Sequence, residues 1–168
     1  AKGQPHAGDQ REIEKRNDVL VYTSQPLDAP LQIIGNVSVE LYAASDARDT
    51  DFTAKLVDVY PDGRAVRLGT VNSGIIRARF RHGLDSETLL TPGKVEKYEI
   101  PLLAMAHTFL SGHSLRLEIS SSAYPNMMPN QNTGKPVATD TEWRVARQTI
   151  YHDRTHLSAL LLPVYDGD

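Results

Sequence analysis

One stretch in the first half of the chain constrains the fold more than any other, because it has the pattern of a strand with two apolar faces. Alternate residues of a strand point to opposite faces of the sheet. Phe52, Ala54 and Leu56 therefore share one face, while Val57 and Val59 share the other. A strand of this kind lies inside a sandwich of sheets, or beneath a partner that the chain does not itself contain.

A sharp turn follows this strand, and the rest of the chain repeats the same scheme of short strands and turns. Pro61-Asp62-Gly63 predicts the turn, because proline fixes φ at the first corner and glycine accepts the positive φ that follows. Apolar and polar residues alternate with a period of two, and helical periodicity is almost absent. About nine strands are predicted, over residues 19–24, 31–42 with a break at Gly35-Asn36, 52–59, 66–71, 76–81, 95–102, 113–120, 144–152 and 157–165.

This pattern favours an all-β fold, an antiparallel β-sandwich of the jelly-roll type. The continuous apolar run Leu160 to Leu162 predicts a final strand that is buried on both faces. The 168 residues suffice for one domain with its own core. We expect the sandwich to span residues 19–168.

Residues 1–18 are polar and form a lead-in segment, in which Asp9 is placed to cap a short helical turn. The chain begins with Ala1 rather than Met. We therefore expect it to be a piece of a longer protein whose own N-terminus is missing. The lead-in would then come from an upstream domain.

Composition excludes several classes of function. The chain has no cysteine, so it has neither disulfides nor thiolate metal sites. Its 18 Lys and Arg nearly balance its 21 Asp and Glu, which argues against nucleic acid as a partner. No apolar run approaches the roughly 20 residues that span a bilayer, so no membrane association is expected. The sequence fixes neither compartment nor oligomeric state; a cytoplasmic location is slightly favoured, and a homo-oligomer remains open.

No catalytic constellation is visible. A serine hydrolase of the α/β type needs a Gly-x-Ser-x-Gly elbow, which is absent. Ser120, Ser121 and Ser122 lie at a strand end without flanking glycines, so a structural role is the better interpretation. His152 and His156 are the only histidines with a spacing that could share a helical face, but they fall in a region with a strand pattern. We expect no catalytic residue, metal or cofactor in this chain.

Three carboxylates at the start of the strand predicted over residues 52–59 could either bind a calcium ion or stabilise the turn. Asp46, Asp49 and Asp51 have a spacing that partly resembles a Ca²⁺ loop, but the full Asp-x-Asp-x-Asp-Gly pattern is absent. Capping of the turn and hydrogen bonds between strands are the favoured roles. Whether these carboxylates bind an ion stays open at the level of sequence.

Two features indicate a surface that contacts another domain. Arg77, Arg79 and Arg81 would share one strand face; they either form a solvated or ion-paired face, or dock on acidic groups of a partner. The segment Ala123 to Pro136 is long and lacks periodicity, as functional or docking loops do. Its apolar residues, and Phe52 in the loop at 46–52, are the predicted contact points: Phe52, Tyr124, Met127 and Met128.

Eight separate motifs occur between about Asp9 and Pro163: Arg16 to Ser24, Asp49 to Val59, Pro61 to Ala65, Arg77 to Arg81, Leu90 to Gly93, Phe109 to Leu117, Ile119 to Pro125 and Asn132 to Gly134. Together and in this order they resemble the C-terminal domain of the X-Pro dipeptidyl-peptidase and cocaine-esterase-like (CocE/NonD) hydrolases. Two departures are Ser114, where the family commonly has a basic residue, and Tyr124, where it often has Phe.

The resemblance implies a galactose-binding-domain-like jelly roll that follows an α/β-hydrolase domain. In that family the Ser-His-Asp triad belongs to the hydrolase domain, so no catalytic residue transfers to this chain. The jelly roll packs on the catalytic domain and helps to wall its substrate pocket, through an early loop that would lie at or just before Ala1 to Gly8. The implied function is an accessory domain of an acyl esterase or X-Pro dipeptidyl-peptidase that is inactive alone. The alternative is a free-standing carbohydrate-binding module, which rests on fold analogy.

Overall fold

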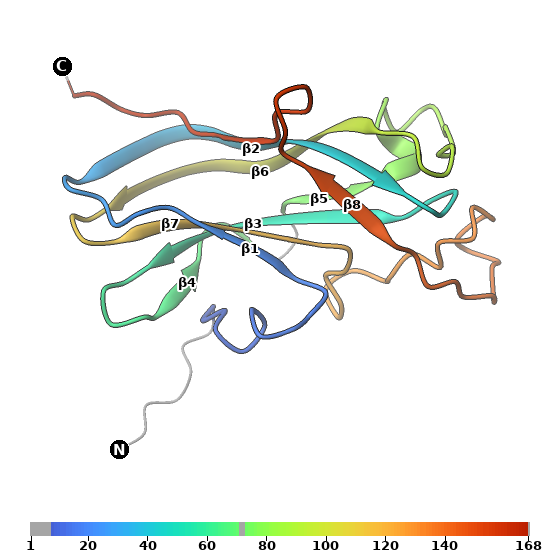
Figure 1. Cartoon of the computed structure of the whole chain (residues 1–168), viewed down its shortest axis with the longest axis horizontal. Coiled ribbons are helices and arrows are strands. Elements are labelled where there is room, and N and C mark those ends of the chain that lie inside the picture. The colour runs from blue at the N-terminus through green and yellow to red at the C-terminus, as the bar shows by residue number, and fades with distance from the viewer. Residues whose placement is uncertain (1–7, 71–72, 168) are drawn as a thin grey trace.

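The computed structural model describes residues 8–70 and 73–167, and in this part of the chain it contains two antiparallel β-sheets that face each other (Figure 1). The elements are β1 (Leu20–Thr23), β2 (Leu31–Ser45), β3 (Asp51–Val59), β4 (Ala65–Arg67), β5 (Ile75–Arg77), a 3₁₀ turn (Ala78–Phe80), β6 (Glu96–Phe109), β7 (Ser114–Ser120), β8 (Gln148–Tyr151) and β9 (Ala159–Leu161).

One sheet has the order β1-β7-β3-β4, with β5 also paired to β3. The other has the order β6-β2-β8, with β9 also paired to β2. The paired strands are antiparallel. The predicted all-β sandwich is therefore confirmed, while the jelly-roll connection pattern stays a prediction.

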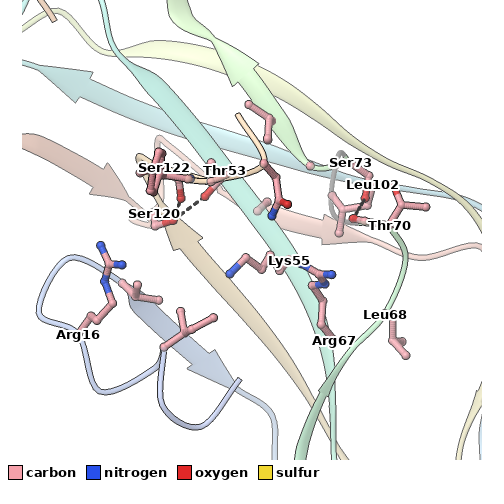
Figure 2. Close-up of a pocket in the computed structure, with 18 residues that line it drawn as sticks. Arg16, Thr53, Lys55, Arg67, Leu68, Thr70, Ser73, Leu102, Ser120 and Ser122 are labelled. Atoms are coloured by element: carbon pink, nitrogen blue, oxygen red, sulfur yellow. Dashed lines mark hydrogen bonds between the residues drawn. The ribbon is translucent and has the colours of Figure 1, made fainter. Parts of the chain in front are cut away.

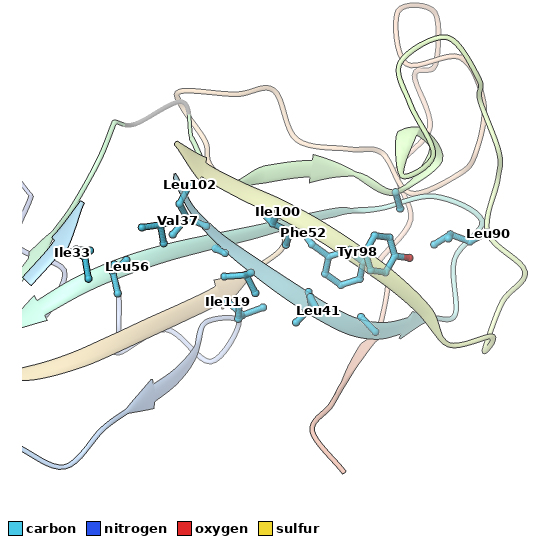
Figure 3. Close-up of a cluster of buried hydrophobic side chains, with 14 of the residues drawn as sticks. Ile33, Val37, Leu41, Phe52, Leu56, Leu90, Tyr98, Ile100, Leu102 and Ile119 are labelled. Atoms are coloured by element: carbon cyan, nitrogen blue, oxygen red, sulfur yellow. The ribbon is translucent and has the colours of Figure 1, made fainter. Parts of the chain in front are cut away.

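The core lies between the two sheets and is made by their inward-facing apolar side chains (Figure 3). Phe52 of β3 packs against Tyr98 of β6 with ring centroids 4.7 Å apart, which joins the two sheets at the centre. Burial raises the pKa of the Tyr98 hydroxyl. Other large members of the core are Ile33, Val37, Val39, Leu41, Leu56, Ile100, Phe109 and Ile119.

The predicted burial of both faces of β3 is confirmed. Leu56 lies in the core, and Val57 on the opposite face is also fully buried. Residues of the lead-in segment cover part of this outer face: the Gln10 amide donates to the Ala65 carbonyl oxygen at 2.8 Å, and Lys55 of β3 donates to the Gln10 side chain at 3.1 Å. The two apolar faces of β3 predicted that something covers the outer face. The chain itself supplies part of this cover.

Several strand boundaries differ from those expected. The break at Gly35-Asn36 was wrong, because β2 runs through it; Gly35 has φ of 134° and leaves room for Pro163, whose Cβ would lie 3.2 Å from an added Cβ. Likewise β6 does not end near Pro101 but continues to Phe109, with Leu103 at a φ of 73°. The last strand is not buried on both faces, since Leu161 is 45% exposed.

Candidate docking surface

One edge of the sandwich is open, because its two sheets end on this side in strands that do not pair with each other. A cleft of about 470 Å³ lies there, and we call it the open-edge cleft. The Tyr22 ring of β1 meets the His152 ring, just after β8, at 5.9 Å and 77° across it. Its apolar lining comes from both sheets: Tyr22, Val39, Leu41, Leu115, Leu117, Ile119, Ile150 and Leu160.

A second cavity of about 420 Å³ shares Ile119 and Ile150 with the open-edge cleft, so the two are adjacent along the same edge. Leu20 of β1 lines it and is 44% exposed. In Figure 1, β1 and β8 both lie on the side that faces the viewer. Apolar surface therefore extends along this edge of the sandwich, where the described part of the chain leaves it uncovered.

The second feature is the long loop, residues 121–147, which lies at one end of the sandwich (orange in Figure 1). Tyr124 is 68% exposed, Met128 is 67% exposed and Met127 is 40% exposed. These three predicted contact residues are thus available at the surface. Phe52 is not: it is 1% exposed because it fills the centre of the core, so its assignment to an interdomain surface was wrong.

A buried polar cluster fastens the long loop to the sandwich. Asn130 is 6% exposed, and its side-chain amide donates to Asp49 Oδ2 at 2.8 Å and to Asp51 Oδ1 at 2.9 Å. Arg79 Nε donates to Asp49 Oδ2 at 2.8 Å, and its Nη2 donates to the Lys135 carbonyl oxygen at 2.8 Å. Asp49 therefore receives donors from two parts of the chain that are far apart in sequence.

The other two arginines have similar roles. Arg77 forms a two-pronged pair with Asp51, at 2.9 and 3.0 Å, and reaches the Met128 carbonyl oxygen at 3.4 Å. Hydrogen bonding to Asp51 raises the pKa of Arg77. Arg81 donates to the Ala78 carbonyl oxygen at 3.0 Å and lies 3.6 Å from Glu96.

These contacts decide between the two interpretations of the arginines. They do not form one strand face, because β5 ends at Arg77 and a 3₁₀ turn follows. Arg79 and Arg81 have side chains only 3% and 4% exposed and are committed to internal partners. Their assignment to a surface that docks on another domain was wrong for this reason, and Arg77, with a side chain 21% exposed, mainly binds Asp51.

Hydrogen bonds also show the roles of the three carboxylates Asp46, Asp49 and Asp51. The oxygens of Asp49 and Asp51 face guanidinium and amide donors, and Asp46 accepts from the Arg147 amide at 2.9 Å. These are the structural roles that the sequence favoured. Among residues 8–70 and 73–167, no three His, Asp or Glu side chains are grouped so as to hold a metal.

Ser120 and Ser122, at the end of β7, also have structural partners. They border a small cavity of about 110 Å³ on the outer face of β3 (Figure 2), while Ser121 lines the second cavity. Ser120 Oγ lies 2.5 Å from Thr53 Oγ1 and bonds the Ser122 carbonyl oxygen at 3.3 Å. Lys55 also lines this cavity, but its Nζ donates to Gln10 and to Glu118 rather than to either serine.

Sequence reasoning missed the open-edge cleft and the Asn130 anchor. The cleft arises because β1 and β8, more than 120 positions apart, come to the same edge without pairing. No local pattern carries that information. One signal was available for the outer face of β3: Lys55 lies between Ala54 and Leu56 in a strand with apolar residues on both faces, and a lysine in such a place predicts a buried partner.

The geometry defines a class: an antiparallel two-sheet β-sandwich with an uncovered apolar edge and a long loop anchored by buried hydrogen bonds. Residues 2–161 match the family of X-Pro dipeptidyl-peptidase C-terminal non-catalytic domains, and the chain belongs to this family.

Known relatives are longer proteins. The chain is 42% identical over 158 residues to cocaine esterase of Rhodococcus sp. (strain MB1 Bresler), a match that covers 93% of this chain and 27% of the esterase. Two solved structures superpose with a TM-score of 0.88: an aminopeptidase from a marine sediment Thaumarchaeota archaeon, 31% identical over 95% of this chain and 28% of its own, and an α-amino acid ester hydrolase, 30% identical over 94% and 27%. The chain thus spans little more than a quarter of each.

None of the helical segments in the described residues has the length and hydropathy that a membrane crossing requires. The early loop that the resemblance placed at Ala1 to Gly8 lies, up to residue 7, outside the described residues.

Proposed function

We propose that this sandwich is the accessory C-terminal domain of a serine hydrolase of the α/β-hydrolase type, which acts on acyl esters or X-Pro peptides. The sandwich packs on the catalytic domain and helps to shape its substrate pocket, and it is inactive alone. Family membership supports this role, as does the small share of each relative that the chain spans. The preceding hydrolase domain is the proposed partner.

The observation that carries the proposal is the coincidence of two uncovered apolar features. Tyr124 and Met128 are each about two-thirds exposed on a loop that buried hydrogen bonds hold in place. The open-edge cleft adds a concave apolar surface of about 470 Å³. An accessory domain needs such a surface, because burial of apolar area is the main favourable term in association.

A chimera tests the proposal. The matched segment of Rhodococcus cocaine esterase is replaced by this chain, and ester hydrolysis is measured for the chimera and for the chain alone. We expect hydrolysis by the chimera only. Tyr124→Ala combined with Met128→Ala should lower the stability of the chimera by roughly 2 kcal/mol, since two apolar anchors lose their contacts, and should leave the isolated chain nearly unchanged.

Leu110→Ala is the matched control. Leu110 is 53% exposed but lies in the turn after β6, at the opposite end of the sandwich from the long loop (Figure 1). Leu110→Ala should leave the stability of both the chimera and the isolated chain unchanged. Equal loss of stability in the chimera and the isolated chain would contradict docking through the long loop, and glycan binding by the isolated chain would instead favour the carbohydrate-binding alternative.

A further inference from the structure

Two buried carboxyl oxygens on the outer face of β3 lack hydrogen-bond partners. Glu118 of β7 is 2% exposed, and its Oε1 accepts no hydrogen bond. The same holds for the buried Oε1 of Glu14 in the lead-in segment. Buried polar atoms nearly always find a partner, so two such atoms in one region require an explanation.

The neighbouring cations fix how these two carboxyl groups lie. Lys55 is directly opposite Glu118 in the β3–β7 register, and its Nζ donates to Glu118 Oε2 at 3.1 Å. Arg116 is on the same face of β7, two residues before Glu118, and its Nη1 donates to Glu14 Oε2 at 2.7 Å. Each carboxyl group thus uses one oxygen for a cation. The remaining oxygens are the two that lack partners, and the two side chains are within hydrogen-bonding reach of each other.

Two ionised carboxylates cannot hydrogen bond, because both only accept. One proton between them would satisfy both orphaned oxygens at once. Burial, and then the adjacent Glu14 carboxyl group, raise the pKa of Glu118, while Lys55 acts in the opposite direction. Carboxylates that share a site behave in this way, with one of the pair holding its proton at higher pH.

We propose that Glu14 and Glu118 share one proton, and that this hydrogen bond is a pH-dependent latch that holds residues 9–18 on the outer face of the sheet. The latch does not depend on the proposed function. Residues 9–18 make two further contacts with the sheet. Asp9 forms an isolated β-bridge with Val66, and the Gln10 backbone amide donates a hydrogen bond to the Ala65 carbonyl oxygen.

The charged groups that face the pair are Lys55 from β3 and Arg116 from β7, and the neighbouring cavity is also lined by Arg16 of the lead-in segment and Arg67 of β4. A raised pKa in the folded state means that the latch is complete below the ordinary glutamate pKa of 4.5 and weakens as the pH rises through the folded-state value. Above that value both carboxylates are charged and repel each other.

Glu118→Gln provides the test, because its amide can still accept from Lys55 and can donate to Glu14 at any pH. The reporter is the hydrogen-exchange protection of the Gln10 backbone amide, which donates to Ala65, measured near pH 5 and near pH 8. In the wild-type chain, protection should be higher near pH 5 than near pH 8, because the shared proton is lost over this range. In Glu118→Gln it should change much less.

Glu12→Gln is the control within the same segment, since Glu12 has a side chain 80% exposed and pairs only with Lys15. It should behave like the wild type. A second readout is the ¹³C shift of the Glu118 carboxyl carbon, which should report a protonated group at a pH where exposed glutamates are ionised. Titration of Glu118 near the ordinary value of 4.5, or the same pH dependence in Glu118→Gln as in the wild type, would overturn the proposal.

Discussion

Asn130 is a single residue on which two buried carboxylates depend. Its amide is a donor to both Asp49 and Asp51, which are 0% and 3% exposed. Arg79 and Arg77 supply the positive charge, but the amide completes the hydrogen bonding and ties the long loop to β3. Removal of one partner from a buried charged group costs more than the bond itself contributes, because the remaining group stays desolvated.

We therefore expect Asn130→Ala to destabilise the chain by about 3 kcal/mol, measured as the free energy of unfolding in urea. Asn130→Asp should destabilise it further at neutral pH, because it adds a third carboxylate to the cluster. Asn126→Ala, on the exposed part of the same loop, is the control and should have little effect. If Asn130→Ala were as mild as Asn126→Ala, the cluster would not be what anchors the loop.

The arginines show why local sequence was insufficient at this scale. Arg79 and Asp49 are 30 positions apart, and Asn130 is 81 positions from Asp49. Only the folded topology brings them together. The sequence correctly indicated ion pairing as one interpretation of the arginines, yet nothing in their spacing identified their partners or the 3₁₀ turn that contains Arg79.

At the scale of elements, the strands were the most predictable part of the molecule. Sequence patterns predicted β1, β3 and β7 nearly correctly: β7 alternates apolar and polar residues, β3 is apolar on both faces, and β1 is a short apolar stretch between polar segments. The long strands β2 and β6 were cut short, since glycine and proline are normally strand-breaking signals. Here β2 accommodates Gly35 at positive φ, and the register between the two strands shifts at Val37 and Ser38.

The lead-in segment is the element whose role changed most. We expect removal of residues 1–18 to lower the midpoint of thermal unfolding, because it uncovers part of the outer face of β3 and leaves Lys55 and Arg116 without Gln10 and Glu14. A second truncation that begins at Gly8 separates residues 8–18 from those before them. Equal midpoints for chains that begin at residue 8 and at residue 19 would show that this segment contributes nothing to the fold.

At the scale of the whole molecule, the open edge should govern how the isolated chain behaves. An uncovered apolar edge promotes self-association when no partner is present. We expect the isolated chain to associate reversibly as its concentration rises, and Leu20→Lys on β1 to reduce this by placing a charge beside the cleft. Sedimentation velocity measures the effect. Leu110→Lys at the far end of the sandwich is the control, and an equal reduction by both variants would exclude the open edge as the cause.

The buried cluster beneath the long loop has a consequence for recognition as well as for stability. A loop of this length without regular structure would ordinarily lose much conformational freedom when it binds, and that entropy loss weakens association. Here the bonds among Asn130, Asp49 and Arg79 order the loop during folding, before any partner arrives. In the proposed docking, Tyr124 and Met128 would therefore be presented on a preorganised support, so that more of the free energy of their burial would remain available as affinity.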